Sequence, residues 1–186
     1  MLLIFSATAW IQTGYWKNSI FLFKHTIEVT NNNYTAHTCL ANAYIDRGIN
    51  TLAIEHYVKA LEINPNHAKT YFNLGLVLAK EGYADAAIRH FKLSLKIHPE
   101  QAKTHNALAL ELAKKKLLDD AIFHFKKAVR LDPEFIDAQN NLGFAYLLNE
   151  EYTKAIHLFK TILKNDTLHQ KTKNNLKKAI EKSKKQ

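Results

Sequence analysis

The prolines of this chain are separated by one constant interval. Pro65, Pro99 and Pro133 are the only prolines among 186 residues, and they stand 34 residues apart. A fixed period of this length is typical of repeat proteins, in which each unit is one supersecondary structure and stacked units share a continuous core. With each proline set as the thirty-second residue of its unit, the predicted units are residues 34–67, 68–101, 102–135 and 136–169.

Four columns of apolar or small residues recur with the same period. The seventh place holds leucine, the eighth and twentieth hold small residues, and the twenty-fourth is aromatic. In unit order, the columns are Leu40, Leu74, Leu108 and Leu142; Ala41, Gly75, Ala109 and Gly143; Ala53, Ala87, Ala121 and Ala155; Tyr57, Phe91, Phe125 and Phe159. Small residues let two helices approach closely, and the leucine and the aromatic ring fill the space between them. Proline ends a helix, so the second helix of each unit is predicted to stop before it. Together with the packing columns, this predicts two antiparallel helices per unit.

The period, the helical spacing and the four columns together resemble the tetratricopeptide repeat (TPR) family over nearly the whole chain. The resemblance implies an all-α fold, a right-handed superhelix (α-solenoid) of helix-turn-helix units. One departure is Thr167 in place of the last proline. The other is the fourth place, which holds His37, Tyr71, His105 and Gln139 instead of a regular aromatic residue, and we expect the two histidines to pack between helices.

Both flanks of the four units fit the same frame. With the frame continued upstream, Gly14, Tyr15, Ile20 and Phe23 hold the places of Gly82, Tyr83, Ile88 and Phe91, which predicts a degenerate first unit within residues 1–33. Residues 170–186 are predicted to form a basic capping helix and tail, because a solenoid must cover its last apolar face with a helix whose outer side is polar and exposed to solvent. Docking of this basic end on anionic lipid or nucleic acid is an alternative.

Lysine dominates the positive charge of the chain. The formal net charge is +9, but only Arg47, Arg89 and Arg130 are arginines. Because recognition of phosphates and bases favours the forked guanidinium group, the charge is better interpreted as a solvated surface, and nucleic acid is not expected as a partner. The single Cys39 excludes an internal disulfide.

No motif in the sequence predicts catalysis, a cofactor or a metal site. There is no nucleophile motif, glycine-rich phosphate loop or cluster of metal ligands. His56, His90 and His124 are spaced by one repeat, so they should lie about 8–10 Å apart on the second helices of successive units, too far to converge on one ion. Asp119 and Asp120 open a helix, where the helix dipole favours acidic residues.

The TPR resemblance implies that the first helix of each unit lines a concave groove. The second, fifth, sixth, ninth, twelfth and thirteenth places of the unit face into this groove. At those places stand Thr38, Cys39, Asn42, Lys69, Phe72, Asn73, Leu76, Lys80, Lys103, Asn106, Leu110, Lys114, Asn140, Asn141 and Phe144. Asparagine amides can donate to and accept from a peptide backbone, and lysines attract carboxylates. We therefore predict an acidic or extended peptide or protein segment as the ligand and no small-molecule substrate.

One family variant makes this prediction sharper. TPR clamps that grip acidic chaperone tails use two asparagines and basic residues in successive units. Asn42, Asn73 and Lys103 match that pattern. Thr38 and Ala107 stand where two further cations belong, so a clamp built here would hold a terminal carboxylate weakly.

Residues 10–37, WIQTGYWKNSIFLFKHTIEVTNNNYTAH, carry a second resemblance. They are similar to the stretch that joins the last membrane helix to the TPR tail in multi-pass glycosyltransferases of the protein O-mannosyltransferase type. The residues concerned are Trp10, Gln12, Thr13, Tyr15, Trp16, Ser19, Phe23, His25, Val29, Thr30, Asn32, Asn33, Tyr34, Ala36 and His37. This resemblance implies that the apolar segment MLLIFSATAWI is the end of a membrane helix. The catalytic acidic residues of such enzymes lie in membrane-domain loops outside this sequence.

The leading prediction is a non-catalytic scaffold that binds a peptide or partner protein in the TPR groove. The first alternative is the TPR tail of a membrane glycosyltransferase, where the groove would select acceptor proteins. The second is the scaffold that docks through its basic end. A free-standing chain would be cytoplasmic, and a glycosyltransferase tail would be membrane-associated with its repeats outside the cytoplasm.

Overall fold

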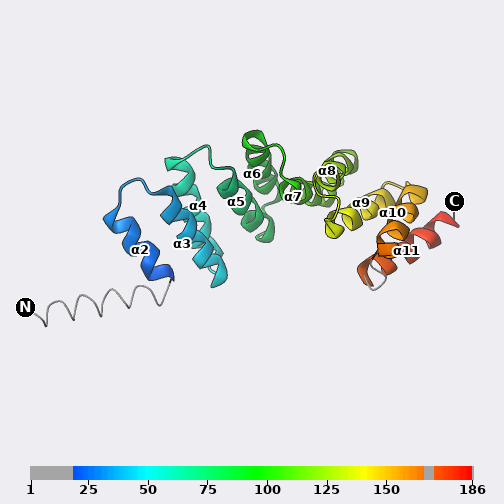
Figure 1. The fold of residues 1–186 in the computed structure, drawn as a ribbon, viewed down its shortest axis with the longest axis horizontal. Coiled ribbons are helices and arrows are strands. Elements are labelled where there is room, and N and C mark those ends of the chain that lie inside the picture. The colour runs from blue at the N-terminus through cyan, green and yellow to red at the C-terminus, as the bar shows by residue number, and fades with distance from the viewer. Residues whose placement is uncertain (1–18, 166–169, 186) are drawn as a thin grey trace, which may run out of the picture. The chain divides into compact units, whose positions relative to one another are not determined.

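The computed structural model describes residues 19–165 and 170–185, and all regular structure in these ranges is α-helical. The helices are α2 (Ser19–Val29), α3 (Tyr34–Asp46), α4 (Asn50–Ile63), α5 (Ala68–Lys80), α6 (Ala84–Ile97), α7 (Ala102–Lys114), α8 (Leu118–Leu131), α9 (Ile136–Leu148), α10 (Tyr152–Asn165) and α11 (Gln170–Ser183) (Figure 1). The predicted all-α fold is confirmed. The exact bounds of each repeat stay a prediction.

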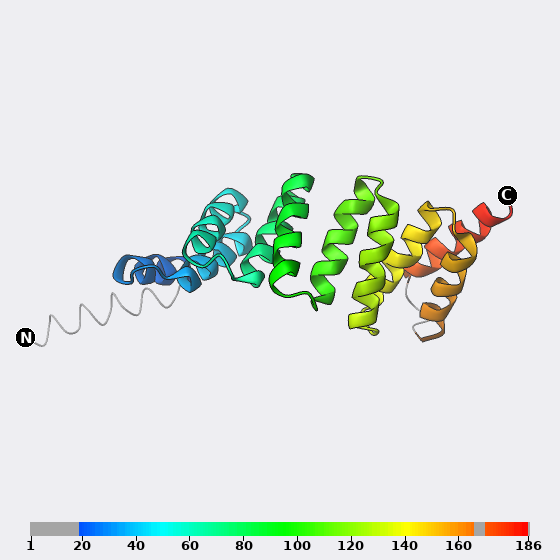
Figure 2. The same cartoon turned by 90° about the horizontal axis from the view of Figure 1, so that it is seen from above.

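Two compact units divide the chain, and each is described by itself. In the first, residues 1–83, α2 packs on α3, α3 on α4, and α4 on α5. In the second, residues 84–186, each helix from α6 to α11 packs on the next along the chain (Figure 2). Contacts between α7 and α9, and between α9 and α11, bring alternate helices together as well. α7 and α9 are the first helices of two predicted repeats and α11 is the predicted capping helix, and together they form one face of the second compact unit.

The four sequence columns form the core. Leu40, Leu74 and Leu108 at the seventh place are at most 1% exposed. The aromatic column Tyr57, Phe91, Phe125 and Phe159 is at most 2% exposed, and the alanines of the twentieth place are fully buried. The period therefore identified the side chains that hold each pair of helices together.

At Gly143, α9 approaches α10 closely. A Cβ atom at this position would lie 2.5 Å from Cε1 of Phe159, whose ring is fully buried. Glycine at the eighth place of this unit is thus needed for packing rather than for backbone freedom.

The turn inside each helix pair has a left-handed residue at the same place. Gly48 and Gly82 adopt φ of 73° and 85°, and Lys116 and Glu150 adopt φ of 62° and 60° at the corresponding positions. Left-handed backbone costs a non-glycine residue about 1 kcal/mol. The turn geometry is evidently set by the packed helices, since it persists where the glycine is absent.

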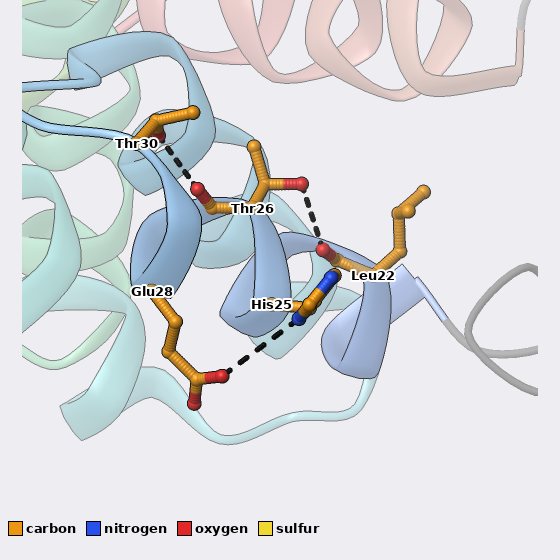
Figure 3. A network of polar contacts seen from close by, with 5 residues as sticks. All are labelled: Leu22, His25, Thr26, Glu28 and Thr30. Carbon is orange, nitrogen blue, oxygen red and sulfur yellow. Dashed lines mark hydrogen bonds and ion pairs between the residues drawn. The ribbon is translucent and has the colours of Figure 1, made fainter. Parts of the chain in front are cut away.

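Local hydrogen bonds mark the end of α2 and the start of α3. Thr26 Oγ1 donates to the Leu22 carbonyl at 2.8 Å, and Thr30 Oγ1 donates to the Thr26 carbonyl at 2.6 Å (Figure 3). After the turn, Asn33 Oδ1 accepts from the Ala36 backbone N–H at 2.9 Å and caps α3. Side-chain bonding of this kind competes with the helix ladder and favours a break between the two helices.

Some expectations fall outside the described residues. They include the apolar segment of residues 1–11, Gly14 and Tyr15 of the degenerate first unit, and Thr167. In residues 19–165 and 170–185, no helix has the length and apolar character needed to cross a membrane.

Candidate functional site

In the first unit, Asn42 and Asn73 lie side by side on α3 and α5. Asn73 Nδ2 donates to Asn42 Oδ1 at 3.3 Å, and the Tyr57 hydroxyl on α4 donates to the same oxygen at 2.5 Å. Burial raises the pKa of Tyr57 to about 12, so its hydroxyl stays protonated and remains a donor. With its oxygen held by two donors, the Asn42 side chain has a fixed orientation, and its amide N–H groups can meet an incoming carbonyl.

Four other predicted groove residues of this unit lie on α5, the helix that carries Asn73. Leu76 is 43% exposed, and Lys69 and Lys80 are exposed. Phe72 is half-buried. We define the first-helix face as the surface of α3 and α5 in the first unit, and of α7, α9 and α11 in the second.

The second unit repeats the amide arrangement on its own first-helix face. Asn141 Nδ2 donates to Asn106 Oδ1 at 3.1 Å, and Lys171 Nζ donates to Asn141 Oδ1 at 3.3 Å. The result is a chain of hydrogen bonds across α7, α9 and α11. Lys171 was not predicted, although it occupies the second place of its segment, like Lys69 and Lys103. Carrying the repeat frame beyond residue 169 would have found it.

An apolar hollow of about 210 Å³ opens next to Asn141. Phe125 lies among its walls, and Leu110 (37% exposed), Phe144 (38%) and Leu148 (47%) hold apolar surface at its edge. Its full lining is Leu110, Ala113, Lys114, Phe125, Asn141, Phe144, Ala145 and Leu148. Four of these were predicted as groove residues from the repeat places, and the structure brings them together. Leu148 was missed, although it holds the thirteenth place, as Lys80 and Lys114 do.

Charged side chains frame the hollow. Lys114 Nζ donates to Glu111 Oε1 at 2.6 Å, and the Glu111 residue is only 4% exposed, so the lysine is held at the rim. A second hollow of about 370 Å³ shares Phe144 and Leu148 with the first and includes Lys178 and Lys182 of α11. Glu150 and Glu181 also line it. The first-helix face of this unit therefore offers apolar space flanked by amides and ammonium groups.

Asn140 differs from its prediction as a groove residue. Its side chain is fully buried, and its Oδ1 accepts from Thr172 Oγ1 at 3.0 Å and from Asn175 Nδ2 at 3.2 Å. It therefore joins α9 to α11 and is not available to a ligand. Thr38 holds the same fifth place in the first predicted repeat, residues 34–67, and is likewise buried, with its Oγ1 3.0 Å from that of Thr70.

Asn106, Lys103 and Cys39 complete the predicted set, and Cys39 is half-buried. Asn106 is 9% exposed and serves mainly to orient Asn141, whereas Lys103 is exposed. Because Lys103 belongs to the second unit and Asn42 and Asn73 to the first, the three-unit clamp stays a prediction.

Two histidine pairs join helices inside the units. His37 Nδ1 lies 3.0 Å from His56 Nδ1, and His105 Nδ1 lies 2.9 Å from His124 Nδ1. His105 Nε2 is 3.0 Å from the Pro99 carbonyl, which can only accept, so this nitrogen carries the hydrogen. In the neutral pair, His105 Nδ1 is then the acceptor and His124 Nδ1–H the donor. The expected packing role of His37 and His105 is confirmed.

These pairs remain neutral at physiological pH. Burial first, and then the neighbouring His105, lowers the pKa of His124 to about 4. Burial also lowers the pKa of His37, His56 and His105. In the described part of the chain, no group of three or more His, Cys, Asp or Glu side chains could hold a metal ion.

Acidification is expected to destabilise the chain through these histidines. A histidine whose pKa is lower in the folded state binds fewer protons when folded, so its stabilising effect is complete above the unfolded pKa of about 6.5 and is lost as the pH falls toward the folded value. From pH 7 to pH 5, His124 alone should lower the free energy of unfolding by about 1 to 2 kcal/mol.

Urea unfolding at the two pH values measures this loss. His105→Gln provides the comparison, because Gln139 at the same place of the next unit donates to the Pro133 carbonyl. A glutamine at position 105 should keep the hydrogen bond to the Pro99 carbonyl, and it should reduce the pH dependence of the free energy of unfolding. An unchanged pH dependence in His105→Gln would show that His105 does not contribute to it, contrary to this prediction.

Two family models match the sequence. One, described as TPR repeat, matches residues 41–82 and 110–150, and the other, described as Tetratricopeptide repeat, matches residues 68–101. Together these ranges cover more than half of the chain. The chain belongs to the TPR family.

Solved structures of TPR proteins share the fold. MamA is 24% identical, with a TM-score of 0.67 over 94% of this chain and 92% of that chain. A MamA chain from Desulfovibrio magneticus RS-1 is 21% identical, with a TM-score of 0.77 over 91% of this chain and 96% of its own. YrrB, a TPR protein with an unusual peptide-binding site, is 20% identical, with a TM-score of 0.76 over 94% of this chain and 87% of its own. At these identities the likeness concerns the fold.

Comparison with curated proteins finds no match. The matching family models and solved structures concern TPR proteins and give no support to the glycosyltransferase resemblance of residues 10–37, to membrane association or to docking through the basic end.

Proposed function

We propose that this TPR protein is an interaction scaffold that binds an extended segment of a partner protein on its first-helix face. The observation that carries the proposal is the apolar hollow beside Asn141. Leu110, Phe144 and Leu148 keep apolar surface in water there, which is costly unless a partner covers it.

The chemistry of the face suits a peptide in two ways. The hollow of about 210 Å³ offers space to one apolar side chain. Beside it, Asn141 is oriented by Asn106 and Lys171, and an asparagine amide can donate to a backbone carbonyl and accept from a backbone N–H. Fixing the asparagine before binding reduces the entropy lost on complex formation.

Charge favours carboxylates in the ligand. Lys103 and Lys114 are exposed on the first-helix face of the second unit, as Lys69 and Lys80 are on that of the first. Lys178 and Lys182 line the neighbouring hollow, opposed by Glu150 and Glu181. We therefore propose a peptide with an apolar anchor and flanking acidic residues, and a function in binding without catalysis.

Peptides selected from a random library against the whole chain provide the test. Leu110→Ala/Leu148→Ala is expected to weaken the affinity of a selected peptide at least about tenfold, because truncating a buried anchor contact typically costs more than 1 kcal/mol. Fluorescence anisotropy of the labelled peptide measures the dissociation constant.

A matched variant controls for changes in surface hydrophobicity. Leu93 and Leu117 are 39% and 46% exposed, close to the 37% and 47% of Leu110 and Leu148, but they do not line the hollow. Leu93→Ala/Leu117→Ala should leave the affinity unchanged. Equal losses in the two double variants would place the peptide elsewhere and refute the proposed groove.

A further inference from the structure

A larger hollow lies among α6, α7 and α8 of the second unit, which are consecutive packed helices (Figure 2). Its volume is about 520 Å³, and none of its lining residues lines the two hollows of the first-helix face. We call it the α6–α8 hollow. Its floor is apolar, with fully buried Leu108 and half-buried Leu95 and Leu131.

Four cations line this hollow together with one carboxylate, that of Glu100. They are Lys92, Lys96, Lys127 and Arg130. In the part of the chain that the structure describes, none of the four forms an ion pair, whereas Lys59, Lys114, Lys115 and Lys154 each pair with a nearby acidic residue. The cations repel one another, and an anion between them would relieve that repulsion.

An exposed aromatic ring lies among the cations. Phe123 also lines the hollow and is 55% exposed, and Lys127 Nζ lies 5.7 Å from the centre of its ring. Aromatic side chains are enriched at protein interfaces. The hollow thus combines charge complementarity to an anion with a place for an apolar side chain.

The helix dipole explains only part of this charge. Lys96 and Arg130 lie in the last turns of α6 and α8, where a cation is favourable without any ligand. Lys92 and Lys127 lie before those last turns, and the dipole does not account for Phe123.

We propose that the α6–α8 hollow is a second docking site, which takes an acidic segment of a partner polypeptide independently of the first-helix face. Carboxylates along an extended chain can reach cations on both α6 and α8, and an apolar side chain can cover Phe123 and the leucine floor. A phosphate group would be expected to meet arginine forks or an unopposed helix N-terminus. Here three of the four cations are lysines, and Glu100 precedes the start of α7.

The test uses an eight-residue peptide of glutamates with one central phenylalanine, titrated into the isotope-labelled chain and followed by NMR. Saturable shifts are expected in α6 and α8 and in the imidazole signals of His105 and His124, which line the hollow. The pKa of His124 should rise on binding, because the peptide carboxylates offset Lys92 and Lys127, which help to lower it in the free chain.

Two matched double variants locate the charge contacts. Lys92→Gln/Lys96→Gln should weaken binding of this peptide about tenfold, as expected for two cations at an interface. Lys160 and Lys164 hold the same two places on α10, are exposed and do not line the hollow. Lys160→Gln/Lys164→Gln removes the same charge and should leave binding unchanged.

Equal weakening of peptide binding by both double variants would overturn the proposal, and so would NMR shifts confined to α11 or the first-helix face. Binding of an oligonucleotide of equal charge but not of the peptide, or no saturable binding at millimolar peptide, would overturn it as well. The first-helix face is tested separately, because the library-selected peptide depends on Leu110 and Leu148 and not on Lys92 and Lys96.

Discussion

Phe125→Ala is expected to lower the free energy of unfolding by about 4 kcal/mol, the loss typical of a buried phenylalanine that leaves a cavity. Phe125 is 1% exposed and belongs to the aromatic column that fills the space between the two helices of a unit. Contacts in a repeat protein are made mainly between neighbours, so few distant contacts compensate for the cavity. Urea unfolding followed by circular dichroism measures the loss.

The neighbouring Phe123 supplies the control for this prediction. It lies on the same helix and is 55% exposed, so Phe123→Ala should change the free energy of unfolding by no more than about 0.5 kcal/mol. Similar losses for the two variants would mean that the aromatic column is not the core of the unit.

Gly143→Val is expected to destabilise the chain by about 3 kcal/mol, because added volume at a closely packed position forces the helices apart or the side chains out of their rotamers. A Cβ atom here would lie 2.5 Å and 2.9 Å from Cε1 and Cζ of the fully buried Phe159. Gly143→Ala should cost less, about 1 kcal/mol, since alanine favours the helix and occupies the same place in two other units, at Ala41 and Ala109.

A double-mutant cycle shows whether the clash is the cause. If the valine is destabilising because it meets the Phe159 ring, Gly143→Val/Phe159→Leu should be less destabilised than the sum of the two single changes, by at least about 1 kcal/mol. Strict additivity in urea unfolding would contradict the packing explanation.

Most of the fold was predictable from the sequence because the residues that pack each pair of helices recur at the same places in every repeat. The spacing of Pro65, Pro99 and Pro133 predicted where helices end, and α4, α6 and α8 do end two residues before them. The aromatic column predicted which rings are buried. Because each column occurs in four repeats, a chance match of residue types is a poor explanation for it.

The features that depend on contacts between helices were harder to predict. Asn140 looked like a groove residue from its place in the repeat, but docking of α11 buries it against Thr172 and Asn175. His105 and His124 were both noted in the sequence, yet their pairing 19 residues apart follows from how α7 packs on α8. The α6–α8 hollow likewise has no sequence motif, since its cations come from two helices separated by a third.

NMR spectra of the whole chain, recorded on leucine methyl groups and asparagine side-chain amides with and without a library-selected peptide, test the proposed groove most directly. The proposal predicts saturable shifts of the Leu110 and Leu148 methyls and of the Asn141 amide, with the Leu93 and Leu117 methyls unchanged. Shifts of the Leu93 and Leu117 methyls, with Leu110, Leu148 and Asn141 unaffected, would show that the first-helix face is not where this TPR protein binds its partner.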